Sequence, residues 1–224
     1  GVRQARLPAG ARRRTMTRSW RHLGISLVVA ALCAATWYAG EPTEATARLS
    51  LLTAWLCFAL LAAALCIGPW RVLHGGQPTL NSLLRRDLGI WAAITALAHL
   101  LAATVVVMTP VYYGRYINGT DNQPLSFPVG QASIISGYLI GIVCLLLLAV
   151  SSNLALRVLG AQRWKFLQRW AYGVFALTAA HGLAFQYIEF RTGIWLIVLG
   201  LCRLPVLALQ LPGRRAVLRR TLRG

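Results

Sequence analysis

Six long apolar stretches, five of them without any charged residue, constrain this 224-residue sequence more than any other feature does. A helix that crosses the hydrocarbon core of a bilayer needs about 20 mostly apolar residues, whereas strands are usually much shorter. Helices also satisfy their own backbone hydrogen bonds in lipid, so these stretches predict membrane-spanning helices. The predicted spans cover residues 23–40, 49–70, 88–109, 132–156, 170–188 and 192–212.

The composition excludes an ordinary soluble domain, because 57% of the residues are hydrophobic and only 12% are charged. The net charge of +18 does not indicate nucleic-acid binding, because the basic residues form short runs between apolar stretches. Of the 23 Lys and Arg residues, 19 lie in segments on one side of the predicted bundle and three on the other. The positive-inside rule then places both termini in the cytoplasm.

The sequence therefore predicts an all-α, integral membrane six-helix bundle with both termini cytoplasmic, in a bacterial-type inner membrane. We expect a basic cytoplasmic tail over residues 1–22, a transmembrane domain over 23–212 and a second basic cytoplasmic tail over 213–224. The segment 157–169 is expected to be a cytoplasmic loop.

Ionisable residues inside predicted spans are candidates for function, because they cost free energy in lipid. Only His99, His181 and Arg203 qualify. His99 lies 11 residues after Leu88, and His181 lies 11 residues after Trp170, so both are about 16 Å from the cytoplasmic boundary. Two imidazoles at matched depth on separate helices are what a six-coordinate haem requires.

The residues around both histidines are small, which leaves room for a flat macrocycle or permits close helix packing. His22 and His74 lie outside the predicted spans and are expected to be solvated. The small neighbours, together with one large aromatic residue, are Ala92, Thr95, Ala96, Ala102 and Ala103 around His99, and Gly173, Val174, Thr178, Gly182, Ala184 and Phe185 around His181.

Arg203 is the only charged residue in a predicted span. A guanidinium at this depth needs a partner, and no acidic residue of the other spans supplies one. Two interpretations stay open: Arg203 binds a haem propionate, or it reaches a boundary or bonds backbone carbonyls.

Other chemistries find little support in the sequence. The five cysteines occur singly and no C-x-x-C-H motif is present, so a covalently attached haem is excluded. Neither H-E-x-x-H nor G-x-G-x-x-G occurs, which leaves the chain without a zinc-protease helix or a nucleotide fold of its own. Electrons would have to come from a separate donor.

Two segments resemble the ferric reductase-like transmembrane domain family: RRDLGIWAAITALAHL (85–100) and SSNLALRVLGAQRWKFLQRWAYGVFALTAAHG (151–182). This family includes the haem membrane subunit of the periplasmic methionine sulfoxide reductase system. The resemblance implies that His99 and His181 are the axial ligands of haem b. It also implies that Arg85 and Arg86 hold haem propionates or the phosphate of a flavin, FMN or FAD. Many members have a second His where this chain has Gln168, so the number of haems is left as one or two.

Three hypotheses follow. The first is an oxidoreductase subunit that passes electrons through haem b from a cytoplasmic, flavin reductase-like donor to ferric iron or a periplasmic acceptor protein. The second is a membrane transporter or channel without redox chemistry, with His99, His181 and Arg203 lining a polar path. The third is a structural membrane subunit.

Overall fold

The computed structural model describes residues 19–31, 34, 44–74, 83–119, 126–190 and 193–221, and this part of the chain contains helices and no strands. Residues 19–31 are helical. The elements that follow in chain order are α2 (Ala45–Leu73), α3 (Leu83–Val107), α4 (Pro110–Tyr113), η1 (Gly114–Asn118), α5 (Ser126–Ala149), α6 (Asn153–Ile188) and α7 (Ile194–Thr221). All are α-helices except η1, which is a five-residue π-helix.

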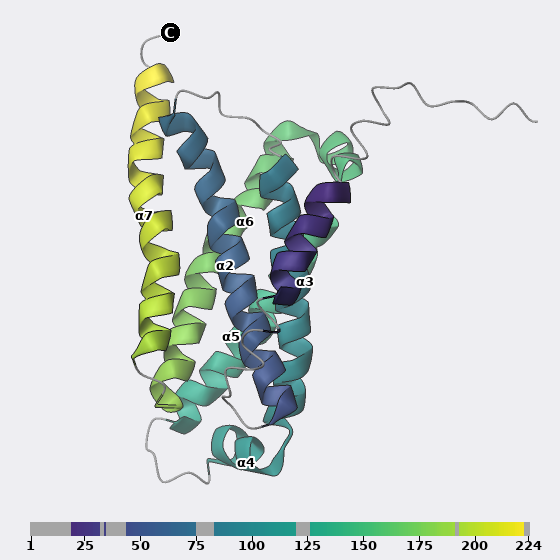
Figure 1. Ribbon diagram of the computed structural model, residues 1–224, viewed down its shortest axis with the longest axis vertical. Helices are drawn as coiled ribbons and strands as arrows, with labels where there is room; N and C mark the ends of the chain where they lie inside the picture. Colours follow the sequence, from purple (N-terminus) through teal and green to yellow (C-terminus); the bar gives the residue numbers. More distant parts are fainter. Residues whose placement is uncertain are drawn as a thin grey trace, which may run out of the picture.

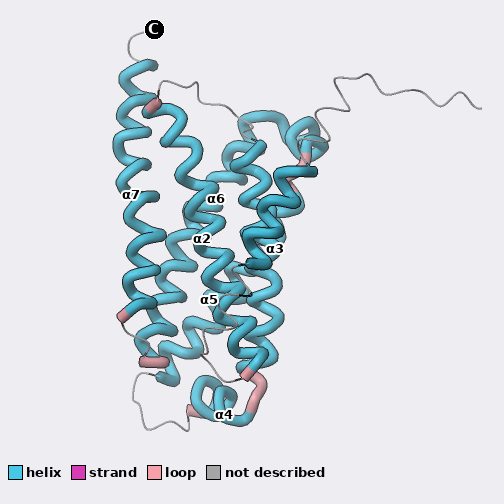
Figure 2. Tube along the Cα trace, viewed as in Figure 1, coloured by secondary structure: helices cyan, strands magenta, loops and turns pink. Residues whose placement is uncertain are grey.

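The five long helices α2, α3, α5, α6 and α7 lie side by side, and successive ones run in opposite directions (Figure 1). The short elements α4 and η1 close one end of this bundle, hereafter the α4 end. At the opposite end of the bundle, the helix over residues 19–31 begins and α7 ends (Figure 1). Figure 2 shows the described residues as helix apart from short loop and turn segments.

The expected all-helical architecture is confirmed for the described residues. Three helices there are long and apolar enough to cross a membrane, namely Ala45–Leu73, Leu83–Val107 and Phe127–Ala149. They correspond to the second, third and fourth predicted spans. The fifth and sixth predicted spans lie in α6 and α7, and α7 contains a shorter apolar stretch, Leu199–Gly213. The first predicted span lies partly outside the described residues.

Two predicted boundaries are wrong. The span predicted over 132–156 ends at Ala149, because Ser152 starts a new helix by accepting a hydrogen bond from the Ala155 amide at 2.9 Å. The expected loop 157–169 is helical apart from Gly160, whose φ of 72° turns the chain at the start of α6.

The core of the bundle is apolar and so is much of its exterior. Phe58 of α2 and Phe175 of α6 stack at its centre, with ring centroids 5.0 Å apart and planes 4° from parallel. Large aliphatic side chains are exposed on the outside, including Leu101 at 71% and Ile135 at 68%. An exterior of this kind suits contact with lipid tails.

The end of the bundle opposite α4 contains a buried carboxylate. Asp87 of α3 is fully buried and accepts a hydrogen bond from the Nε of Arg21 at 3.1 Å. Its other oxygen lies 3.5 Å from Nε2 of His22, and the indole of Trp91 donates to Nδ1 of the same histidine. The expectation of a solvated His22 is therefore wrong. Residues 19–22 belong to the described helix, and the expected basic tail over residues 1–22 stays a prediction.

Candidate functional site

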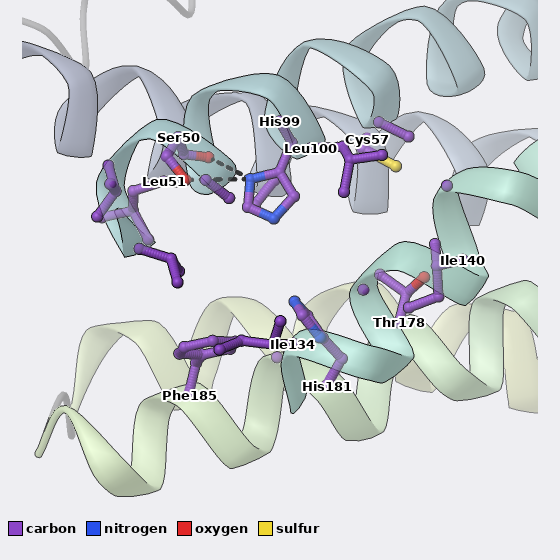
Figure 3. A pocket seen from close by; sticks show the side chains of 18 of the residues that line it. Ser50, Leu51, Cys57, His99, Leu100, Ile134, Ile140, Thr178, His181 and Phe185 are labelled. Carbon is purple, nitrogen blue, oxygen red and sulfur yellow. Dashed lines mark hydrogen bonds between the residues drawn. The ribbon is translucent and has the colours of Figure 1, made fainter. Parts of the chain in front are cut away.

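His99 and His181 lie opposite each other in a pocket in the α4-end half of the bundle. His99 comes from α3 and His181 from α6, and their ring centroids are 6.2 Å apart with planes 83° from parallel. Figure 3 shows the two imidazoles extending toward each other from opposite walls of the pocket. The sequence prediction that these two residues lie at one depth is consistent with this pairing.

Backbone carbonyls fix the tautomer of both histidines. Nδ1 of His99 donates to the carbonyl oxygen of Ser50 at 2.8 Å, and Nδ1 of His181 donates to that of Ser133 at 2.9 Å. A carbonyl oxygen only accepts, so each Nδ1 carries the ring proton and each Nε2 keeps a free lone pair. Serine hydroxyls lie near the same atoms, with Oγ of Ser50 at 3.3 Å and Oγ of Ser136 at 3.2 Å. Both rings are thus prepared as ligands through Nε2.

The spacing of the rings suits one metal ion between them. Two imidazoles that bind one metal head-on, with metal–nitrogen bonds of about 2 Å, have ring centroids about 6 Å apart. No group of three or more His, Cys, Asp or Glu suited to a metal ion occurs among the described residues. A haem needs only two axial ligands from the protein, because the macrocycle supplies the other four. The donor set therefore fits a haem better than a bare metal ion.

Small residues provide space beside the histidines, in part as the sequence predicted. Ala96 and Ala103 line the pocket on α3, and Thr178, Gly182 and Phe185 line it on α6. The ring of Phe185 packs against His181 with centroids 5.0 Å apart. The other predicted neighbours are not among the lining residues, namely Ala92, Thr95, Ala102, Gly173, Val174 and Ala184.

Sequence reasoning missed the contribution of α2 and α5. Besides the two carbonyls, Gly137 of α5 lies directly against the His181 ring, where an added Cβ would come within 3.0 Å of Cε1. The available signal was the spacing of Ser133, Ser136 and Gly137, which places these three residues of α5 on one face of the helix. It carries no charge or motif, so only the packing of α5 against α6 makes its role visible.

The three arginines predicted to bind a cofactor are not among the residues that line this pocket. Arg86 lies 13 residues before His99 on α3, about 20 Å along the helix axis. It donates to the side chain of Asn153, and Arg85 lies beside Gly68. Arg203 donates to the backbone carbonyl of Ala179, which agrees with the interpretation that it bonds backbone carbonyls. A cofactor role for these arginines stays a prediction.

The structure brings together one pair of histidines. All four histidines of the chain are described. His74 stacks on Trp70 at the end of α2, and its Nδ1 lies 2.9 Å from the Trp70 carbonyl oxygen. It is exposed to solvent and does not line the pocket. Gln168 lies 3.5 Å from the hydroxyl of Ser151. The number of haems, one or two, stays a prediction.

Comparison with known proteins identifies a family to which the sequence is similar. No solved structure matches the chain. The family described as ferric reductase like transmembrane component matches residues 51–179, more than half of the sequence, and this range includes His99 and ends two residues before His181. The extent of this match confirms the resemblance seen in the sequence. The chain belongs to the family of ferric reductase-like transmembrane components.

Proposed function

We propose that this protein binds one haem b between His99 and His181 and carries electrons across a membrane. Family membership supports a membrane electron-transfer role. The haem assignment depends mainly on one observation, the pair of buried imidazoles whose Nδ1 atoms donate to backbone carbonyls while both Nε2 atoms stay free. Two such ligands give a six-coordinate, low-spin iron.

Each group in the pocket has a separate task in this proposal. A bound haem supplies reversible one-electron chemistry at its iron. The carbonyls of Ser50 and Ser133 hold the imidazoles in one orientation and increase their basicity through the Nδ1 hydrogen bonds. The buried side chains of Cys57 and Phe58 exclude water from the apolar wall of the pocket. Rigid ligands of this kind change little between the ferric and ferrous states, which favours fast electron transfer.

The direction of transfer follows from the charge distribution. We propose six membrane spans in a bacterial-type inner membrane, with both termini and the basic connections in the cytoplasm. The α4 end then faces the periplasm, and the histidine pair lies in the outer half of the membrane. A cytoplasmic, flavin reductase-like donor would deliver electrons at the basic end, with FMN or FAD as the carrier. Ferric iron or a periplasmic protein would accept them at the α4 end, which makes the chain an oxidoreductase subunit.

The absorption spectrum of the purified protein tests this proposal. Protein expressed with ample haem should show a low-spin b-type spectrum, and acidified organic solvent should extract the haem. His99→Ala and His181→Ala should each abolish or convert this spectrum. His74→Ala is the matched control and should leave the spectrum unchanged. Colourless wild-type protein would overturn the haem assignment and favour the transporter or structural alternatives.

A further inference from the structure

Among the described residues, Tyr116, Gln186 and Thr178 line the pocket and each has a buried polar atom without a hydrogen-bond partner, and the first two are themselves buried residues. The hydroxyl of Tyr116 belongs to a residue that is only 1% exposed, and Oε1 of Gln186 belongs to one that is 5% exposed. Both residues line the pocket that contains His99 and His181. An unpaired buried polar group is unfavourable by about 1–3 kcal/mol. The Tyr116 hydroxyl on η1 and the Gln186 side chain on α6 therefore indicate that a polar ligand group lies near them.

The structure holds the Tyr116 hydroxyl in place. An added Cβ on Gly130 would lie 2.6 Å from the Tyr116 ring, so this glycine forms the notch in which the ring sits. The same ring packs edge-on against Phe185 with centroids 5.9 Å apart, and Phe185 packs against His181. The hydroxyl therefore belongs to a fixed stack that starts at a proposed haem ligand.

Both polar groups lie on the α4 side of the histidines. Tyr116 belongs to η1, which closes that end of the bundle, and Gln186 follows His181 by five residues, about 7.5 Å farther along α6. The opposite end of the pocket is mainly apolar, with Cys57, Phe58 and Ile140 in its wall. The hydroxyl of Thr178 is the one unpartnered side-chain group identified on that side.

Charge at the α4 end is balanced before any ligand enters. Glu189 lines the pocket, and its carboxylate lies 3.3 Å from Nη1 of Arg115. The guanidinium of Arg115 also lies 5.9 Å from the centre of the Tyr116 ring. This ion pair offsets the negative charge of Glu189, although Arg115 itself is not among the residues that line the pocket. Arg203, the other candidate cation, donates to the Ala179 carbonyl and does not line the pocket.

A haem is itself polar along one edge, where it has two propionate carboxylates, and apolar along the other. We propose that the α4 end of the pocket is the propionate site, in which the Tyr116 hydroxyl and the Gln186 amide donate hydrogen bonds to the carboxylates. The unpaired atom of Gln186 is the acceptor Oε1, so its contact with a carboxylate requires the amide to rotate by half a turn and present Nε2. The apolar edge of the macrocycle then lies against Cys57 and Phe58. This inference rests on the haem of the proposed function and assigns the haem's orientation within it.

The first test is haem retention in haem-loaded protein. Tyr116→Phe and Gln186→Leu each remove one hydrogen bond with little change of shape, and each should increase the rate of haem transfer to apomyoglobin about tenfold. The resonance Raman band of propionate bending should shift in both variants. Tyr172→Phe is the matched control, because its hydroxyl already pairs with Gln210 at 3.2 Å and it does not line the pocket, so it should leave the band in place.

A haem without free carboxylates separates this inference from a general loss of stability. In protein loaded with iron octaethylporphyrin, which has neither carboxylate nor ester groups, Tyr116→Phe should cause no further increase in the transfer rate. An equal increase with haem and with iron octaethylporphyrin would overturn the propionate site, as would a Raman shift in Arg203→Leu but not in Tyr116→Phe. If wild-type protein binds no haem at all, the proposed function itself fails. Normal binding with unchanged retention in both variants overturns only the orientation.

Discussion

The two halves of the bundle differ in what fills the space between the same helices. In the α4-end half, small residues and the turned-in imidazoles of His99 and His181 surround a pocket. In the opposite half, large side chains such as Leu65, which is 1% exposed, fill the space between α2 and its neighbours. The stacked rings of Phe58 and Phe175 stand between the two regions.

Three polar side chains illustrate the difference between the two halves. In the packed half, the amide of Gln210 on α7 donates to the Leu65 carbonyl at 3.1 Å and to the Tyr172 hydroxyl at 3.2 Å. In the pocket half, Tyr116 and Gln186 keep polar atoms without such partners. Polar groups that satisfy one another strengthen a packed core, whereas unsatisfied ones mark a place for a ligand. The comparison teaches that these helices surround one pocket, which suits the proposed haem, and one structural core.

Filling the pocket should have the largest effect. Gly137→Val would place a branched side chain where an added Cβ already comes within 3.0 Å of the His181 ring, so the imidazole must move. We expect haem content to fall to about a tenth or less of wild type, since such overpacking costs about 1–3 kcal/mol. Haem per protein is measured by pyridine haemochrome assay. The control is Gly173→Val, because a Cβ at Gly173 meets no atom within 4 Å. Equal haem loss in both variants would contradict this role of Gly137.

The sequence predicts the two histidines of this site better than their surroundings. Counting residues from each span boundary was enough to place His99 and His181 at one depth, because the rise of a helix is fixed. The carbonyls of Ser50 and Ser133 could not be found in this way, since every residue has a carbonyl and only helix packing decides which one meets an imidazole. For the same reason the pairing of His22 with Asp87 was missed, because it joins residues 65 positions apart.

Creating a cavity in the packed half should weaken the fold without affecting the haem. Phe175→Ala removes a ring that is 8% exposed and stacks on Phe58, and such truncations destabilise proteins by about 3–5 kcal/mol. We expect a lower Tm in detergent, measured by intrinsic fluorescence, with haem per protein unchanged. Phe175 is not among the residues that line the pocket. Loss of haem as severe as in His99→Ala would show that the two halves are not independent.

The charge of Arg203 should tune the haem from the border between the halves. Its guanidinium donates to the carbonyl of Ala179, two residues before His181. A positive charge near the iron favours the reduced state, so Arg203→Leu should lower the midpoint potential by tens of millivolts, where 59 mV is a tenfold change in a one-electron equilibrium. Redox titration measures this shift. Arg203→Lys keeps the charge and should restore most of the potential. An unchanged midpoint in Arg203→Leu with full haem occupancy would make Arg203 a structural link between α6 and α7.

The smallest effect concerns one hydroxyl beside His181. Oγ of Ser136 donates to the Ser133 carbonyl at 2.8 Å and lies 3.2 Å from Nδ1 of His181, so its lone pair accepts part of the same N–H. Acceptors at Nδ1 make the imidazole more basic and stabilise ferric iron. Ser136→Ala removes one acceptor but keeps the Ser133 carbonyl, so the midpoint potential should rise by about 20 mV, a third of the 59 mV that corresponds to a tenfold change. Ser151→Ala is the control, because its hydroxyl donates to the Leu147 carbonyl in the packed half and should leave the potential unchanged. The sign is opposite to that expected for Arg203→Leu, and a decrease in Ser136→Ala would contradict the assigned direction of the Nδ1 hydrogen bond.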